Sequence, residues 1–173
     1  GETSADEANK LVVKIIKKVC ELEGFKNITE EDIIEQTLAS DVMDKKPPII
    51  YENMHLADIL KIFSENDSLY YPVVDKDKKL HGIITVEGIK QTFLETDISG
   101  LILANDLMEA VMTTISCEAS IRDVMKALDR YNIEYLPVVN KDNMLQGFIE
   151  RKKLSKFIST KIIELQKQAD SLD

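Results

Sequence analysis

Apolar and polar residues alternate along this chain with two different periods. Between Leu56 and Phe63, apolar residues recur at i, i+3, i+4 and i+7, which places them on one face of a helix. The same spacing returns between Ile121 and Leu128. Ser120, with Asp123 three residues later, adds the signal of a helix N-terminus in front of this second stretch. The pattern therefore predicts two amphipathic helices.

Two short β-rich runs follow each of these helices. "YYPVVD" and "LHGIIT" flank the polar turn "DKDKK", and "YLPVVN" and "LQGFIE" flank "NKDNM". Such runs with a short polar turn are typical of a β-hairpin. A further helix is expected over about 86–94 and again from about 151 onward, with a first short strand near Ile49–Ile50 or Thr114–Ile115. Each half of the chain thus predicts the order β-α-β-β-α.

The two halves are copies of one unit. Residues 38–93 align without gaps on residues 103–158, an offset of 65, with sixteen identities in fifty-six positions. We infer an internal duplication. One copy of about 55 residues is too small to bury its own apolar face. We therefore expect the copies to pack face to face, so that each supplies the core that the other lacks.

Helices are also predicted outside the copies. An apolar stripe over 11–22 lies opposite a charged, lysine-rich face, and Gly24 is suited to end that helix. Thr29 begins a short helix with an acidic first turn. Leu154, Ile158, Ile162 and Leu165 form a last stripe. These stripes either pack against the repeats or join subunits. The division is a helical flank (1–37), repeat 1 (38–102), repeat 2 (103–160) and a helical extension (161–173).

Composition excludes several classes of protein. The 173 residues carry a net charge of −9, which argues against nucleic-acid binding. Two cysteines give no disulfide framework, so a cytoplasmic location is expected. His55 and His81 lack metal-ligand spacing, so we predict no metal site. No apolar run approaches the roughly 20 residues of a membrane span, and no signal peptide is visible. The opening "GETSAD" suggests a piece of a longer protein, membrane proteins included.

Catalytic motifs do not appear in the sequence. It contains no Walker glycine loop, no nucleophile elbow and no HExxH. The carboxylates are numerous, but none is distinguished from a solvated surface. We therefore predict that the chain is not an enzyme and has no catalytic residues.

The order "DVM" or "DLM", then "PVV", then Gly-φ-φ-Thr (φ being apolar) resembles the cystathionine-β-synthase (CBS) domain. Two such domains in tandem form a Bateman module, and the resemblance covers Leu38 to about Thr160. It implies a pseudo-symmetric α/β disc with two clefts for regulatory ligands such as AMP, ADP, ATP or S-adenosylmethionine. No cofactor is required. The resemblance also implies a homodimer that regulates enzymes, transporters or channels.

The ligand motif of this family, Gly-φ-φ-Thr-x-x-Asp, is altered in both copies. The family's Thr and helix N-terminus hold phosphate, and its Asp binds ribose. Repeat 1 keeps Thr85 but has Gly88 in place of the Asp, and Thr85 could equally be a helix N-cap. Repeat 2 has Glu150 in place of the Thr and Lys153 in place of the Asp. Because Glu150 would repel phosphate, we expect a nucleotide to prefer the first cleft.

By this resemblance, the predicted ligand-binding residues are Ile49, Ile50, Tyr71, Pro72, Thr85 and Gly88. The predicted second cleft comprises Thr114, Ile115, Leu136, Pro137, Glu150, Arg151 and Lys153. For Tyr71 and Leu136, plain packing in a strand is an equally good interpretation. Arg151 and Lys153 could reverse the charge of Glu150 or lie on a solvated face. Gly82 and Gly147, at the start of the second hairpin strands, are expected to be structural because the backbone there needs room or positive φ.

A narrower resemblance concerns the ends of repeat 2. "LILANDLMEAV" and "GFIERKKLSKF" are similar to the cytoplasmic tails of chloride-channel-family proteins in prokaryotes. This likeness implies fusion to a transmembrane transporter or channel. Two functions stay open at this point. The chain is either a regulatory module that senses an adenosine-type nucleotide, or a structural dimerisation module that has lost its ligand.

Overall fold

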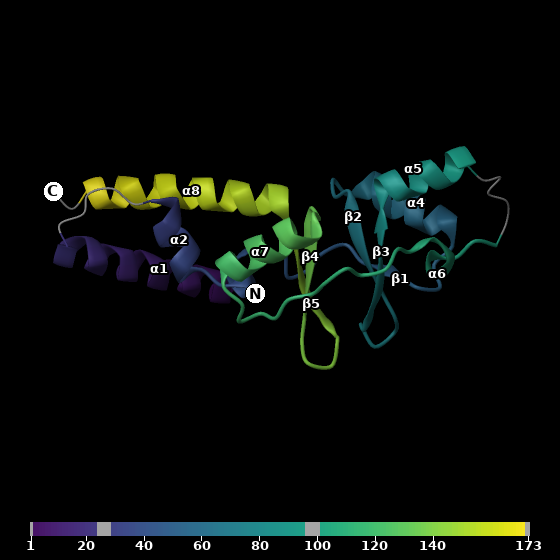
Figure 1. Ribbon diagram of the computed structural model, residues 1–173, viewed down its shortest axis with the longest axis horizontal. Helices are drawn as coiled ribbons and strands as arrows, with labels where there is room; N and C mark the ends of the chain where they lie inside the picture. Colours follow the sequence, from purple (N-terminus) through teal and green to yellow (C-terminus); the bar gives the residue numbers. More distant parts are fainter. Residues whose placement is uncertain (1, 24–28, 96–100, 172–173) are drawn as a thin grey trace. The chain divides into compact units, whose positions relative to one another are not determined.

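The computed structural model describes residues 2–23, 29–95 and 101–171, with side chains in the first helix described for 5–16 (Figure 1). The chain forms two compact units. One comprises Gly1–Met43, Ile115–Leu136 and Ile149–Asp173, and the other comprises Asp44–Thr114 and Pro137–Phe148. The units cut across the two sequence copies, because the hairpin turn of repeat 2 belongs with repeat 1.

The second unit contains a three-stranded sheet with the order β1-β2-β3. Strand β1 (Ile50–Tyr51) pairs in parallel with β2 (Tyr70–Val74), and β2 pairs antiparallel with β3 (Leu80–Thr85). Helix α4 (Leu56–Glu65) connects β1 to β2, and α5 (Val86–Glu95) follows β3. This is the β-α-β-β-α order predicted for repeat 1.

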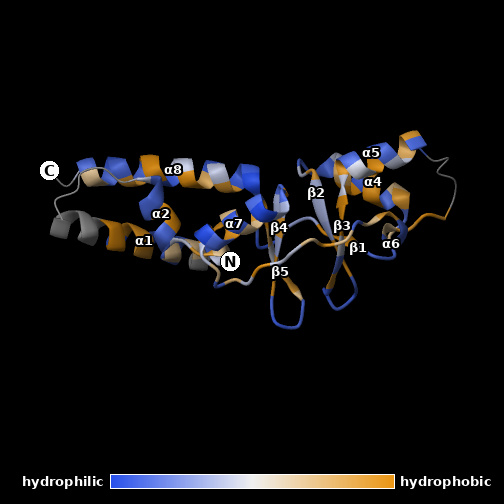
Figure 2. Ribbon diagram, viewed as in Figure 1, coloured by the Kyte–Doolittle hydropathy of each residue, from blue (hydrophilic) through white to orange (hydrophobic). Residues whose placement is uncertain are grey.

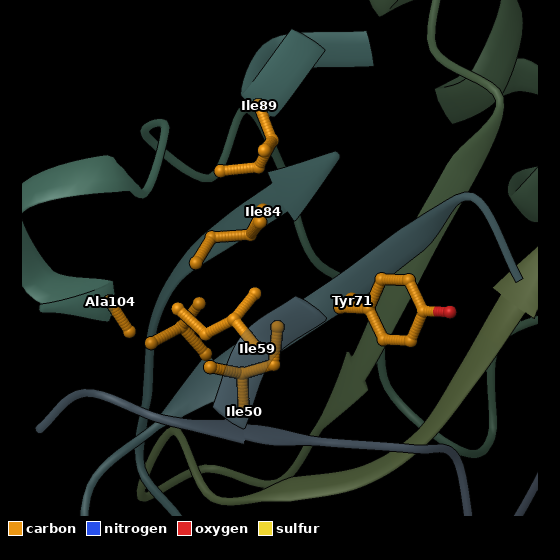
Figure 3. Packing of buried hydrophobic residues seen from close by; sticks show 7 residues of the cluster. Ile50, Ile59, Tyr71, Ile84, Ile89 and Ala104 are labelled. Carbon is orange, nitrogen blue, oxygen red and sulfur yellow. The ribbon is translucent and has the colours of Figure 1, made fainter. Parts of the chain in front are cut away.

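A buried cluster forms the core of this unit (Figure 3). Its members come from β1, α4, both hairpin strands and α5, which is what the amphipathic pattern predicts. They are Ile50, Ile59, Tyr71, Val73, Ile84, Ile89 and Ala104. Ala104 is the exception, because it begins α6 (Ala104–Leu107) in repeat 2. The amide of Ala104 donates to the carbonyl of Met54 at 2.8 Å. Repeat 1 therefore completes its core with a segment of repeat 2.

The two hairpin turns also meet in this unit. Strands β4 (Tyr135–Val139) and β5 (Leu145–Glu150) form a two-stranded sheet. The amide of Leu80 donates to the carbonyl of Asn143 at 3.0 Å, and the amide of Leu145 donates to the carbonyl of Lys78 at 2.9 Å. These positions differ by the repeat offset of 65, so the contact is reciprocal. Both turns are hydrophilic (Figure 2).

Five helices make up most of the first unit. They are α1 (Glu2–Glu23), α2 (Glu30–Gln36), α3 (Ala39–Val42), α7 (Ile121–Tyr131) and α8 (Arg151–Asp170). Helix α2 packs against α8, α7 and α1 (Figure 1). Ile33 and Ile34 of α2 are buried, and Thr29 caps the helix through a capping box with Asp32. The predicted start of this helix is confirmed.

The apolar stripes of the flanking helices pack within the chain. In α8, Leu154, Ile158 and Leu165 are buried, and α8 contacts α2. In α1, Val12 and Ile16 are buried, whereas Leu11 is 57% exposed. The side chains of Val19 and Leu22, and all of Gly24, lie outside the described part of the chain. Of the two interpretations, packing within the chain is thus the one observed for α8.

Repeat 2 differs from the prediction at its first strand. Thr114 is outside any strand, and Ile115 is a single bridge residue. The segment before it carries no pair of isoleucines like that at 49–50, so less apolar surface holds the backbone in place. The predicted cap of α7 is confirmed, because the Ser120 hydroxyl accepts from the amide of Asp123 at 3.1 Å. Helix α8 runs without a break past residue 160.

Candidate functional site

The first candidate site lies where β3 ends and α5 begins. The hydroxyl of Thr85 accepts a hydrogen bond from the backbone amide of Gly88 at 2.9 Å. This bond satisfies one of the amides that the first turn of a helix leaves without a partner. Thr85 is therefore an N-cap, the structural interpretation offered by the sequence. A ligand phosphate at this position would compete with that hydrogen bond.

An acidic side chain from repeat 2 lies at the same place. A Cβ atom added to Gly88 would lie 2.8 Å from Oε1 of Glu109 and 2.8 Å from the hydroxyl of Thr85. Two backbone hydrogen bonds hold Glu109 there. The amide of Ile83 donates to the carbonyl of Glu109 at 3.0 Å, and the amide of Glu109 donates to the carbonyl of Ile83 at 2.7 Å.

Glu109 was missed in the sequence because it is distant from the Thr85 motif along the chain. One signal was available. The residue that follows "DVM" in repeat 1 is Asp44, and the residue that follows "DLM" in repeat 2 is Glu109, so this position is acidic in both copies. A carboxylate therefore lies beside the Thr85 motif as well as in the altered motif of repeat 2.

The remaining residues predicted for the first cleft separate into two groups. Ile50 and Tyr71 are fully buried, and Pro72 is buried. The ring of Tyr71 contacts that of Phe63, with 4.9 Å between centroids. These three residues form core. Ile49 is half-buried and lines a cavity together with lysine side chains.

The second altered motif is occupied by an ion pair. Nζ of Lys153 lies 3.3 Å from Oε2 of Glu150, and the Glu150 side chain is 11% exposed. These are the two positions at which the family motif has Thr and Asp. Glu150 is the N-cap residue of α8 and Lys153 lies in its first turn, so the two charges compensate each other at the start of this helix.

Arg151 contacts residues outside the altered motif. Its Nη1 lies 2.8 Å from Oδ1 of Asp129, and its Nε lies 3.4 Å from Oε2 of Glu134. Its Nη2 also donates to the carbonyl of Ile133 at 3.2 Å. Arg151 thereby ties the start of α8 to the end of α7 and the start of β4. Its charge is shared with two carboxylates, which limits what it can offer a ligand.

The other residues predicted for the second cleft differ in their burial. Leu136 is fully buried and Pro137 is buried, whereas Thr114 is exposed and Ile115 is half-buried. Leu136 therefore follows the packing interpretation, as Tyr71 does in repeat 1.

Two groups outside these sites have shifted pKa values. His81 donates to Asp75 with 2.8 Å between Nε2 and Oδ2, and this hydrogen bond lowers the pKa of Asp75. Burial opposes this lowering of the Asp75 pKa, and hydrogen bonds from the backbone amides of Lys79 and Asp77 add to it. The ion pair with Glu31 raises the pKa of Arg122.

Residues 2–23, 29–95 and 101–171 contain neither a candidate metal cluster nor a helix suited to span a membrane. In these ranges no three His, Cys, Asp or Glu side chains are grouped so as to hold a metal ion. None of the helices in the same ranges combines the length and the apolar character that a membrane crossing needs.

Comparison with known proteins identifies both copies. The family model described as "CBS domain" matches residues 39–95 and 103–160. Homoserine O-acetyltransferase of Methanobrevibacter ruminantium is 28% identical over 137 residues, which are 79% of this chain and 27% of that protein. The uncharacterized protein MJ1426 of Methanocaldococcus jannaschii is 30% identical over 146 residues, covering 66% of this chain and 86% of that protein. The chain spans about a quarter of the length of the acetyltransferase relatives.

Solved structures share the fold. The CBS domain pair of protein MJ0100, in complex with 5′-methylthioadenosine and S-adenosyl-L-methionine, has a TM-score of 0.62 and 25% identity. The match covers 72% of this chain and 98% of that structure. A putative acetoin utilization protein (AcuB) from Vibrio cholerae has a TM-score of 0.68 and 23% identity, covering 76% and 96%.

Proposed function

Because this chain belongs to the CBS domain family, with two copies in tandem, we propose that it is a regulatory module that binds an adenosine ligand without a phosphate group. S-adenosylmethionine and methylthioadenosine are ligands of this kind. The module would pass the bound state to a larger protein to which it is joined. Binding can shift such a protein only if the ligand prefers one of its two states.

The observation that carries this proposal is the carboxylate of Glu109 beside Thr85 and Gly88. Two like charges about 4 Å apart, at an effective dielectric constant near 20, repel by about 4 kcal/mol before any relaxation. A nucleotide phosphate at the start of α5 would meet this repulsion. The sulfonium cation of S-adenosylmethionine would instead be attracted, and methylthioadenosine is neutral there. The complex of the similar MJ0100 pair with these two molecules supports the same ligand class.

The test is calorimetric titration of the chain with S-adenosylmethionine, methylthioadenosine, AMP and ATP. We expect binding of the first two and weak or no binding of the nucleotides. Glu109→Gln should improve AMP binding and weaken S-adenosylmethionine binding, because it removes one negative charge without changing the shape of the side chain. Tighter binding of AMP than of both phosphate-free ligands by the unaltered chain would refute the assignment.

A second variant separates the ligand role of Thr85 from its role as a cap. Thr85→Val removes the hydroxyl, and Thr85→Ser retains it. If the first cleft holds the ligand, Val abolishes binding and Ser preserves it at a temperature where both variants are folded. For the second cleft, Glu150→Thr restores a family residue and should create or strengthen a second binding event. Loss of binding in Glu150→Thr, with Thr85→Val unaffected, would place the ligand in the second cleft.

The larger protein is proposed to be a membrane transport protein, with the chloride-channel type as the narrower hypothesis. The chain would then be its cytoplasmic part. In support, a glycine betaine/carnitine/choline transport ATP-binding protein (OpuCA) of Bacillus subtilis is 29% identical over 115 residues, and the chain covers 28% of it. The sequence of the full-length gene product tests this directly. Ten or more apolar helices, or a transport ATP-binding domain, would support the proposal, and a fused enzyme of another class would refute it.

A structural role in dimerisation is the second candidate function. It is favoured because polar groups of both altered motifs already have partners within the chain. These contacts are the Thr85–Gly88 hydrogen bond and the Glu150–Lys153 ion pair. On α5, Phe93 and Leu94 are 47% and 72% exposed, and such apolar surface favours association. We expect a homodimer in sedimentation at micromolar concentration. A dimer that binds none of the four adenosine ligands would select this function, and a monomer that binds one would exclude it.

A further inference from the structure

A cavity rich in lysine lies in the second unit, away from Thr85 and Gly88 along β3. It has a volume of about 210 Å³. Lys45, Lys46, Lys78 and Gln146 line it, together with apolar residues such as Ile49 and Leu145. We refer to it as the lysine cavity. In the part of the chain that the structure describes, no Asp or Glu is among its lining residues.

This concentration of positive charge is unusual for an acidic chain. The whole sequence has 31 acidic residues against 22 basic residues. A neighbouring pocket has the opposite character, since Glu52, Asp75 and Asp77 line it together with Lys76. Asp44 is adjacent to Lys45 in the sequence, and its Oδ1 accepts from the amide of Lys46 at 3.0 Å. Three lysines around one small cavity favour an anion.

The duplication provides an internal comparison. At the offset of 65, the positions of Lys45, Lys46 and Lys78 correspond to Ala110, Val111 and Asn143. All three positive charges are thus absent from the equivalent places in repeat 2. A requirement of the shared fold would apply to both copies. The shared fold therefore does not require these lysines.

The backbone conformation of Lys78 is unusual for a lysine. Its φ is 62°, in the left-handed region that favours Gly, Asn and Asp over other residues. Asn143 has the same φ of 62° in the other turn, and its Nδ2 donates to the carbonyl of Leu80 at 2.9 Å. Asparagine is thus the residue suited to this turn, and lysine replaces it at a cost in local stability. Backbone strain of this kind is retained where the side chain is needed.

The backbone of Lys78 is also fixed in place. Its amide donates to the carbonyl of Asp75 at 3.0 Å, and its carbonyl accepts from the amide of Leu145 at 2.9 Å. Lys45 is half-buried. A ligand would therefore meet lysines on an ordered backbone, which reduces the entropy lost on binding.

From these observations we infer that the lysine cavity binds a small, multiply charged anion of the phosphate class. The cavity is smaller than the roughly 300–1,000 Å³ of sites for drug-sized ligands, so the ligand is an inorganic phosphate or diphosphate, or the phosphate group of a small ester. Lysine ammonium groups bind such anions through charge-assisted hydrogen bonds. This site is additional to the adenosine site proposed above and does not depend on it.

The test is calorimetric titration with inorganic pyrophosphate, inorganic phosphate and glycerol phosphate at constant ionic strength. Pyrophosphate should bind saturably with one site per chain. Lys78→Asn, which introduces the residue found at 143, should weaken binding about tenfold, as expected for one lost charge-assisted hydrogen bond. Its melting temperature should equal or exceed that of the unaltered chain, because Asn is favoured at this φ. Tighter binding of glycerol phosphate than of either inorganic ion would identify an ester as the ligand.

Lys76→Asn is the matched control, because it removes the same charge from the same turn but lines the acidic pocket. It should change the affinity by less than about twofold. Lys45→Ala, which introduces the residue found at 110, should weaken binding as Lys78→Asn does. Equal losses in Lys76→Asn and Lys78→Asn would show a non-specific charge effect and overturn the inference, as would the absence of saturable binding. Pyrophosphate contains no adenosine, so failure here leaves the proposed function intact.

Discussion

Adding one methyl group at Gly82 tests how the two repeats are joined. A Cβ atom at this position would lie 2.9 Å from the carbonyl oxygen of Glu109 and 2.7 Å from the sulfur of Met108. The Met108 side chain can rotate away. The Glu109 carbonyl cannot, because it is backbone and accepts from the amide of Ile83 at 3.0 Å. Gly82→Ala must therefore displace the segment at 109 from β3.

The cost follows from two contributions. Forcing an extra methyl group into a packed site typically costs about 1–3 kcal/mol. The displacement also weakens the two hydrogen bonds between Ile83 and Glu109, each of which contributes about 0.5–1.5 kcal/mol. We expect Gly82→Ala to lower the free energy of unfolding by about 2–4 kcal/mol. For a chain of this size, that corresponds to a decrease in melting temperature of roughly 5–15 °C.

Thermal denaturation followed by circular dichroism is the assay, with Gly88→Ala as the matched control. A Cβ at Gly88 would also approach its neighbours at 2.8 Å, but these are the side-chain atoms of Glu109 and Thr85. Alanine also gains up to about 1 kcal/mol in a helix. We expect Gly88→Ala to lie within about 1 kcal/mol of the unaltered chain. If Gly82→Ala is as stable as Gly88→Ala, the reasoning about the junction is wrong.

Two further predictions concern stability. Asp75→Asn, which introduces the residue found at 140, should keep the turn but reduce the loss of stability in acid. The depressed pKa of Asp75 means that the His81 interaction stabilises the fold above the ordinary value of 3.8 and is lost as pH falls below it. The gap in urea midpoint between unaltered chain and variant should therefore close below about pH 3.8, and a gap independent of pH would contradict this. Ile33→Ala, in the fully buried centre of α2, should lower the free energy of unfolding in urea by about 2–5 kcal/mol. Arg122→Ala, which removes an exposed ion pair, should lower it by less than about 1 kcal/mol. Similar losses in the two variants would show that charge rather than apolar packing holds α2 in place.

The helices and hairpins of this fold could be predicted from the sequence because their signals are local. The stripes of α4 and α7, the Thr29 and Ser120 caps, and the hairpin turns each depend on residues within one or two helical turns of one another. Gly82 was also predicted correctly as structural. The reason is lack of space beside the backbone carbonyl of Glu109, rather than a left-handed backbone conformation.

The candidate site was harder to predict from the sequence because its residues come from both repeats. Glu109 reaches Gly88 only through the pairing of its backbone with Ile83, a contact that no spacing rule reveals. The ion pair between Glu150 and Lys153 is local, and the two charges at i and i+3 could have indicated it. For Tyr71 the sequence left two interpretations, a residue that lines the cleft and a packed strand residue. Its burial and its contact with Phe63 agree with the second.

The exchange of segments between repeats has a consequence for how this molecule could have arisen. Each repeat borrows the opening helix of the other: Ala104 contacts the carbonyl of Met54, and Ala39, its counterpart at the offset of 65, donates to the carbonyl of Ala119 at 2.8 Å. A single-repeat ancestor would have had to borrow that helix from a second, identical molecule. Two equivalent sites would then have been obligatory, since every substitution appeared twice. Fusion of the genes removed that constraint. Thr85 and Glu150, like Lys78 and Asn143, could then change one at a time, and a symmetric scaffold acquired two unlike surfaces.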